Sequence, residues 1–100
     1  MLDQLTIDFF EPLVGSSFWA VFETGGKVEL RLERVGRVME SEAARLRRTP
    51  FSLFFRGPKS FKLPQQIYSV SHEAFAEPQG IFLVPVGEEA TGYIYEAVFA

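Results

Sequence analysis

Alternation of apolar and charged positions along residues 28–35 is the clearest secondary-structure signal in the chain. Val28, Leu30 and Leu32 are apolar, and the residues between them are charged. A period of two puts successive side chains on opposite faces of a strand. The pattern therefore predicts a β-strand with one face against a core and the other in water.

Five further runs are rich in aromatic and β-branched residues and end at Gly, Pro or polar turns, so we predict strands there too. These strands span residues 18–23, 51–56, 66–72, 80–86 and 93–99. The first, second and fourth of them are apolar on both faces. That suits a closed or strongly curled sheet better than an open one.

Short turns that contain Gly join two neighbouring pairs of these strands into hairpins. Residues 87–92 form the turn of the last pair. For the first pair, a loop of residues 24–26 would place Phe18 opposite Leu32. A loop of Gly25 and Gly26 alone would instead bring the other face of the first strand inward.

Two segments lack strand character. Phe9, Phe10, Leu13 and Val14 share one face of a short helical turn, whose length Pro12 limits because proline is poor inside a helix. Residues 36–50 combine helix formers with a Ser cap and carry many charges. We interpret this second segment as a partly helical connector.

Together these elements predict a mainly β fold. We expect a single small antiparallel barrel or roll of about six strands, with a short N-terminal helical turn and a partly helical connector. One hundred residues suit one domain, spanning residues 1–100. Its core should contain Leu30, Leu53, Leu83 and Phe99.

Composition narrows the class of protein. The chain has no Cys, which excludes disulfides and thiolate metal sites. Residues 1–10 contain Asp3 and Asp8 and lack the basic start of a signal peptide, and the apolar runs are too short to span a bilayer. We therefore expect a cytoplasmic protein without membrane contact. No pattern predicts a metal or a cofactor.

Charge is unevenly spread along the chain. Residues 31–62 hold nine of the ten Lys and Arg but only three acids, a formal charge of +6 against −9 for the remainder. Such a split can produce a dipolar surface. The acidic pI of about 5.1 argues against nucleic acid, so the cations suit a protein partner better. The predicted partner-binding residues are Arg45, Arg47, Arg48, Arg56, Lys59, Lys62 and Gln65.

His72 is the only His and the main candidate for chemistry. We favour a strand His that is hydrogen-bonded near a rim. The alternative is a general base paired with Glu73, Glu77 or Glu96. Glu96 lies on an apolar strand face, where it would reach solvent or pair with a base such as Arg56. No Ser occupies the Gly-x-Ser-x-Gly turn of hydrolases, and no phosphate-loop pattern is present.

Several sequence blocks resemble a small bacterial domain family of unknown function. The blocks are Pro-Phe-Ser-Leu at residues 50–53, Leu-Pro-Gln at 63–65, Phe-Leu-Val-Pro at 82–85 and Tyr-Glu-Ala-Val-Phe at 95–99. The resemblance covers essentially the whole chain and implies a compact, mostly β domain. It also implies a loose association with phage-tail-like gene neighbourhoods. No activity, cofactor or catalytic residue comes with it.

We therefore expect a non-catalytic binding or structural interaction module, such as a component of a phage-tail-like or surface assembly. Its contact region would be the loop of residues 57–66 together with the basic connector, because a loop rich in Pro, Gln and Lys suits display. Two alternatives stay open. One is a small barrel that encloses an apolar ligand; the other is an enzyme that uses His72 and a carboxylate.

Overall fold

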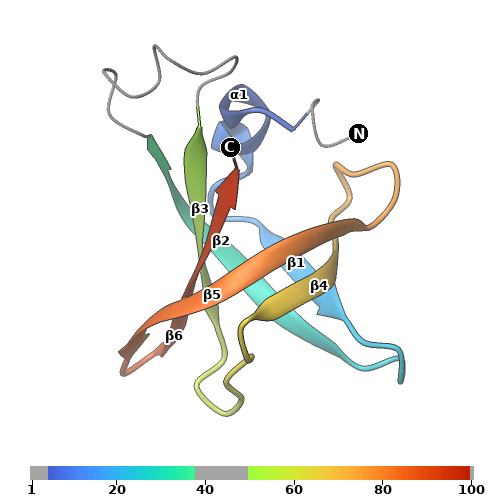
Figure 1. The fold of residues 1–100 in the computed structure, drawn as a ribbon, viewed down its shortest axis with the longest axis vertical. Coiled ribbons are helices and arrows are strands. Elements are labelled where there is room, and N and C mark those ends of the chain that lie inside the picture. Colours follow the sequence, from blue (N-terminus) through green and yellow to red (C-terminus); the bar gives the residue numbers. More distant parts are fainter. Residues whose placement is uncertain (1–4, 38–49, 100) are drawn as a thin grey trace.

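The computed structural model describes residues 5–37 and 50–99. Six antiparallel strands close into a barrel in the order β1-β2-β3-β6-β5-β4, with β4 returning to β1 (Figure 1). The strands are Ser17–Val21 (β1), Lys27–Arg37 (β2), Phe51–Gly57 (β3), Gln66–Ser71 (β4), Gln79–Glu89 (β5) and Gly92–Phe99 (β6). The predicted fold class is confirmed. The predicted connector starts too early, because Gly36 and Arg37 still pair with β3 as the end of β2. Residues 38–49 of the connector lie outside the described residues.

A short helical segment covers one end of the barrel. Helix α1 (Ile7–Phe10) is followed by a 3₁₀ turn, η2 (Glu11–Leu13), and the Thr6 hydroxyl accepts the Phe9 N–H at 3.3 Å to cap α1. This confirms the predicted N-terminal helical turn. It lies over the end of the barrel where β3 starts and β6 finishes (Figure 1).

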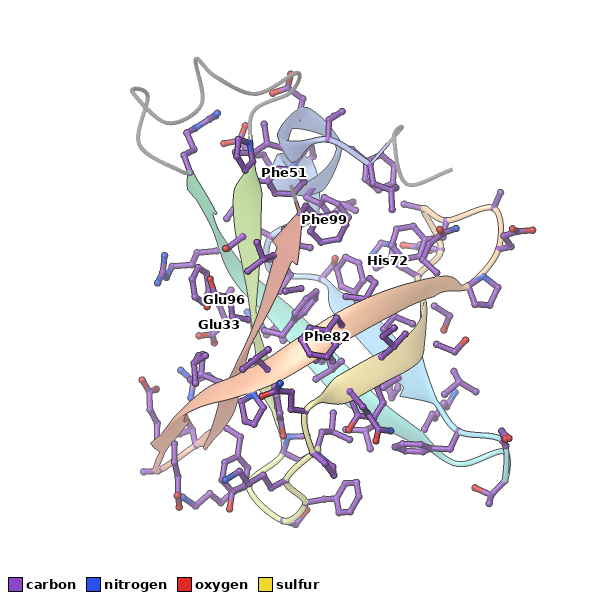
Figure 2. All side chains as sticks on the ribbon, in the orientation of Figure 1. Glu33, Phe51, His72, Phe82, Glu96 and Phe99 are labelled. Atoms are coloured by element: carbon purple, nitrogen blue, oxygen red, sulfur yellow. The ribbon has the colours of Figure 1, made fainter. Side chains whose placement is uncertain are left out.

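Phe10 is the side chain that plugs this end. It is fully buried, and its ring centroid lies 6.4 Å from that of Phe18, 5.9 Å from Phe51 and 5.4 Å from Phe99. Phe51 and Phe99 stack on each other beneath α1 (Figure 2). Burying a Phe side chain contributes roughly 1.5–3 kcal/mol, so the plug anchors the helical segment to the barrel.

The opposite end is closed by the loop between β3 and β4. Leu63 is fully buried there, and its N–H donates to the hydroxyl of Tyr95 at 2.8 Å. Tyr68 donates its hydroxyl proton to the carbonyl of Pro64 at 2.5 Å. Both phenols therefore bury a ring in the barrel and satisfy their polar end on the loop backbone.

Inward side chains from all six strands form one core. Leu30, Leu53 and Leu83 are fully buried and Phe99 is 8% exposed, which confirms the predicted core positions. A barrel of six strands is narrower than the eight-stranded barrels whose interiors are just filled by side chains. The space that an apolar ligand would need is therefore occupied by the core of the protein.

The register of the first hairpin differs from both predicted alternatives. Phe18 lies opposite Leu30 rather than Leu32. The Gly25 N–H donates to the carbonyl of Phe22 at 2.9 Å, and Gly25 has φ +93°, so the loop begins one residue earlier than predicted. A turn followed by a left-handed Gly is the common three-residue hairpin loop. The register moved by two residues, so the inward face stayed as predicted.

A bulge in β2 was not foreseen. The pairing of β2 with β3 shifts between Leu32 and Arg34, so Glu33 is an extra residue. Glu33 and Arg34 therefore both reach the outer surface. There the guanidinium of Arg34 lies 3.8 Å from the ring centroid of Phe54, and Glu33 binds Arg56. A bulge re-aims side chains in this way at the cost of one unpaired residue.

Candidate functional site

The predicted partner-binding residues separate into three groups. Arg45, Arg47 and Arg48 lie outside the described residues. Arg56 and Lys59 lie in ion pairs with acids from other strands. Lys62 and Gln65 are exposed in the loop that leads into β4. This last group borders the outer surface of β4 and β5.

Arg56 links three parts of the barrel. Its Nε lies 2.6 Å from one carboxylate oxygen of Glu33 and its Nη2 lies 3.1 Å from the other, so the pair is bidentate. The same guanidinium donates to Glu89 at 2.6 Å and to the Thr91 hydroxyl at 2.6 Å. These carboxylates raise the pKa of Arg56, and Arg56 lowers the pKa of Glu33. The geometry makes Arg56 a tie between β2, β3 and the β5–β6 hairpin.

Lys59 makes a similar contact at the tip of the same hairpin. Its Nζ lies 2.5 Å from a Glu88 oxygen and 3.1 Å from the Glu89 carbonyl. Both Lys59 and Lys62 lie over the ring of Tyr93, at 5.2 and 5.9 Å. The fold thus brings cations from the middle of the chain onto acids from its C-terminal part. Within the described residues, that pairing reduces the dipole that the sequence predicts.

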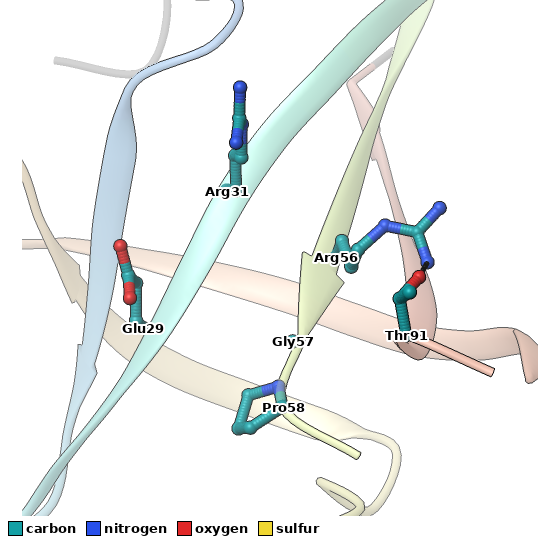
Figure 3. A pocket seen from close by; sticks show the side chains of 6 residues that line it. All are labelled: Glu29, Arg31, Arg56, Gly57, Pro58 and Thr91. Carbon is teal, nitrogen blue, oxygen red and sulfur yellow. Dashed lines mark hydrogen bonds between the residues drawn. The ribbon is translucent and has the colours of Figure 1, made fainter. Parts of the chain in front are cut away.

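An open hollow of about 270 Å³ lies beside Arg56 (Figure 3). It is lined by Glu29, Arg31, Arg56, Gly57, Pro58 and Thr91. A second hollow, of about 260 Å³, lies along β2 between Arg31 and Val14. Four of the five N–H donors of Arg56 are already bonded to protein oxygens, so the first hollow offers an anion mainly Arg31.

His72 follows β4 directly and packs its ring on Phe18, with ring centroids 4.2 Å apart. Its Nε2 lies 2.9 Å from the Ser16 hydroxyl, and its Nδ1 accepts the Ala74 N–H at 2.9 Å. The Ser16 hydroxyl also lies 2.6 Å from the Leu13 carbonyl. His72 is thus a half-buried, hydrogen-bonded residue near the rim, as predicted, but it lies one residue past the end of β4 and not within the strand.

The partners of His72 assign its tautomer. A backbone N–H can only donate, so Nδ1 must accept and the neutral ring carries its proton on Nε2. That proton is donated to Ser16, whose own proton goes to the Leu13 carbonyl. A catalytic Ser–His pair needs the reverse, with Nε2 accepting from the hydroxyl. Burial lowers the pKa of His72, which also favours the neutral ring.

Glu96 pairs differently from the prediction. Its partner is the Ser52 hydroxyl, which donates at 2.7 Å from the neighbouring strand β3, and Arg56 binds Glu33 instead. In the register of β3 and β6, Glu96 lies opposite Phe54, and Arg56 lies two residues further along. The bulge at Glu33 supplies a closer carboxylate to Arg56. Figure 2 shows Glu33 and Glu96 on the side of the barrel away from His72.

The outer surface of β4 and β5 was missed by the sequence interpretation. Residues 63–71 and 78–87 contain no Asp, Glu, Lys or Arg, and these runs form two paired strands. Ile67 lies opposite Phe82 in the register, and these side chains are 68% and 47% exposed. Val86 on β5 is 49% exposed. We call the outward residues of β4 and of β5 up to Gly87 the neutral face.

The position of the neutral face in the barrel makes it distinctive. In the closed strand order, β5 lies opposite β2 and β4 lies opposite β3. The outer surface of β2 carries charges of both signs, including Glu29, Arg31 and Glu33. Figure 2 shows Phe82 on the front of β5, away from that charged side. The outer surface of β2 is therefore charged, whereas that of β4 and of β5 up to Gly87 is not.

Comparison with known proteins places the chain in a family. A sequence profile described as Domain of unknown function (DUF6916) matches residues 5–99. The chain belongs to this family. The match confirms the resemblance to a family of unknown function over almost the entire sequence. No curated protein and no solved structure matches the chain.

Residues 5–37 and 50–99 contain no cluster of three or more His, Asp or Glu side chains suitable for a metal ion. The helices found there are also too short and too polar to cross a bilayer.

Proposed function

We propose that this domain is a non-catalytic protein-interaction module that binds through the neutral face. The observation that carries this proposal is the pairing of two charge-free strands with Ile67 and Phe82 exposed side by side. Interface centres are depleted of charge and enriched in aromatic residues. Exposed apolar patches with a polar rim mark interaction sites.

The proposed contact surface adjoins the one expected from the sequence. Gln65 and Lys62 lie in the loop that runs directly into β4, so they border the neutral face. Arg56 and Lys59 are committed to intramolecular ion pairs, which makes them poorer candidates for the centre of an interface. We propose a tail-like or surface assembly as the setting of this module, on the resemblance alone.

The alternatives gain less support. An enzyme that uses His72 and a carboxylate would need Glu73, Glu77 or Glu96 hydrogen-bonded to the ring, but the two ring nitrogens are bonded to the Ala74 N–H and the Ser16 hydroxyl instead. A ligand-binding barrel would need interior space, which Phe18, Phe55 and Tyr95 fill. A protein-interaction role requires neither a catalytic arrangement at His72 nor space inside the barrel.

Photo-crosslinking in cells tests this proposal. A benzoylphenylalanine placed at Phe82 should form covalent adducts with protein. The matched position is Phe61, which is exposed to the same degree, 49% against 47%, but lies in the loop between β3 and β4. Adducts at Phe61 alone would place the contact surface on the loop between β3 and β4. The absence of adducts at both positions would contradict the interaction role.

A further inference from the structure

We infer that His72 is a pH-sensitive contact whose protonation loosens the cover over one end of the barrel. Figure 2 shows His72 at the same end of the barrel as Phe99. Its Nε2 bonds to the hydroxyl of Ser16, just after η2, and its Nδ1 accepts the N–H of Ala74 in the connection between β4 and β5. The ring thus joins two segments that are distant in the chain. An accepting Nδ1 exists only on the neutral ring, so this pair of bonds belongs to one protonation state.

The connection that His72 holds contributes an aromatic side chain to this cover. Phe75 stacks on Phe9 of α1, with ring centroids 6.0 Å apart, and meets Phe10 edge-on at 6.3 Å. The Phe75 N–H donates to the carbonyl of His72 at 2.9 Å, so Phe75 belongs to the same turn as Ala74. A side-chain acceptor that bonds to the N–H two residues further on stabilises a turn of this kind. The position of Phe75 against α1 therefore depends on Nδ1 of His72.

A proton taken up from solvent breaks one of the two ring bonds and leaves the other intact. On the charged ring both nitrogens carry a hydrogen, so the Nδ1–H would face the Ala74 N–H across 2.9 Å with no acceptor between them. The Nε2–H still donates to Ser16. The ring also keeps its place against Phe18, 4.2 Å away, because an aromatic face attracts a cation. The turn is therefore what opens, and Phe75 moves away from α1 with it.

The charged groups around His72 set the direction of the pH response. Glu73, its neighbour, favours the charged ring, whereas burial favours the neutral ring and has the larger effect, so the pKa lies below its ordinary value of 6.5. Glu77 in the same connection, Asp8 on α1 and Glu11 on η2 are exposed, and β1 contains no charged residue. The bond to Nδ1 is therefore complete near neutral pH. It is lost as the pH falls through the lowered pKa of His72.

Amide hydrogen exchange, followed by NMR between about pH 7.5 and about pH 5, tests the inference. Division of each rate by the intrinsic rate at the same pH gives the fraction of time that the amide is open. The N–H groups of Ala74, Phe75 and Phe10 should be open roughly two- to tenfold more often at the acid end, the effect of losing one hydrogen bond. Gly25 is the matched control. Its N–H donates to Phe22 at the same 2.9 Å in another exposed turn, and its exchange should not respond.

Two substitutions separate this pH response from a purely structural role of His72. His72→Asn keeps a side-chain oxygen that accepts the N–H two residues further on but does not titrate, so the exchange of Ala74 and Phe75 should lose its dependence on pH. Glu73→Gln leaves both ring bonds in place and removes the charge that favours the protonated ring. The midpoint of the transition should then move to lower pH. The chemical shift of the His72 ring proton Hε1 should titrate with the same midpoint as the exchange.

Several results would overturn the inference. A His72 ring that stays neutral down to about pH 5, or one that titrates without any change in the exchange of Ala74 and Phe75, would refute the pH response. An equal rise at Gly25 would assign the change to the whole protein, and a pH dependence that persists in His72→Asn would assign it to another group. A rise confined to Ala74 and Phe75, without Phe10, would refute the loosening of α1. None of these outcomes bears on the neutral face.

Discussion

The close approach of the β5–β6 hairpin to the end of β3 gives the sharpest stability prediction. Gly92 opens β6 with φ +154°, and a Cβ added there would overlap the carbonyl oxygen of Gly57 and come within 3.1 Å of Arg56 Cγ. Figure 3 shows Gly57 and Arg56 on β3 next to Thr91. Gly92→Ala should therefore force the hairpin away from β3.

The magnitude follows from two contributions. A side chain in a sparsely populated positive-φ conformation costs about 1–3 kcal/mol. Separating the strands also weakens the ladder at the pair of Gly57 and Tyr93, where each backbone hydrogen bond contributes about 0.5–1.5 kcal/mol. Together these predict a loss of about 3 kcal/mol in the free energy of unfolding. For a domain of this size, that loss lowers Tm by roughly 10–25 °C.

Urea unfolding followed by the fluorescence of Trp19, the only Trp of the chain, measures the effect. A loss of about 3 kcal/mol should lower the midpoint by roughly 1–3 M. Gly87→Ala in the same hairpin is the matched control, since its Cβ would meet only Ile94 at 3.7 Å. The reasoning fails if Gly92→Ala changes the free energy of unfolding by less than about 1 kcal/mol, or no more than Gly87→Ala does.

Three further predictions concern the core and the rim. Leu30→Ala should cost about 2–5 kcal/mol by urea unfolding, because Leu30 is fully buried; an unchanged midpoint would remove β2 from the core. Tyr95→Phe leaves the buried N–H of Leu63 without its acceptor and should cost about 1–3 kcal/mol, and a cost near zero would mean that another acceptor takes its place. Burial lowers the pKa of His72 from 6.5, so its contribution to stability should be complete above pH 6.5 and decline as the pH falls through the lower folded pKa. His72→Gln should flatten the measured dependence of the unfolding free energy on pH between about 5 and 7, and an unchanged profile would assign that dependence to other groups.

Local patterning was enough to predict the strands. The alternation around Leu30, the aromatic runs and the Gly and Pro turns depend only on neighbouring residues, and a strand displays them whatever it pairs with. The apolar character of the run at residues 51–56 on both faces also predicted a closed sheet correctly. Four predicted core residues are buried because period-two alternation fixes which side chains share a face.

Features that change when the strand pairing shifts by a single residue, such as turns and bulges, could not be predicted from local patterning. The first hairpin loop begins one residue earlier than predicted because Gly25 adopts the positive φ. Gly26 could adopt it equally well, so the sequence does not distinguish the two loops. The bulge at Glu33 leaves no mark on a pattern of alternating charge. It nevertheless decides that Arg56 pairs with Glu33 and that Glu96 pairs with Ser52.

The strands, the inward face and the lack of charge in residues 63–71 and 78–87 follow from the amino-acid sequence alone. That these two runs are neighbours, opposite the charged strand β2, follows from the three-dimensional fold. The reason is that strand patterning is local, whereas strand order is fixed by barrel closure and by contacts between residues distant in the chain. A surface such as the neutral face exists only once those distant segments lie side by side.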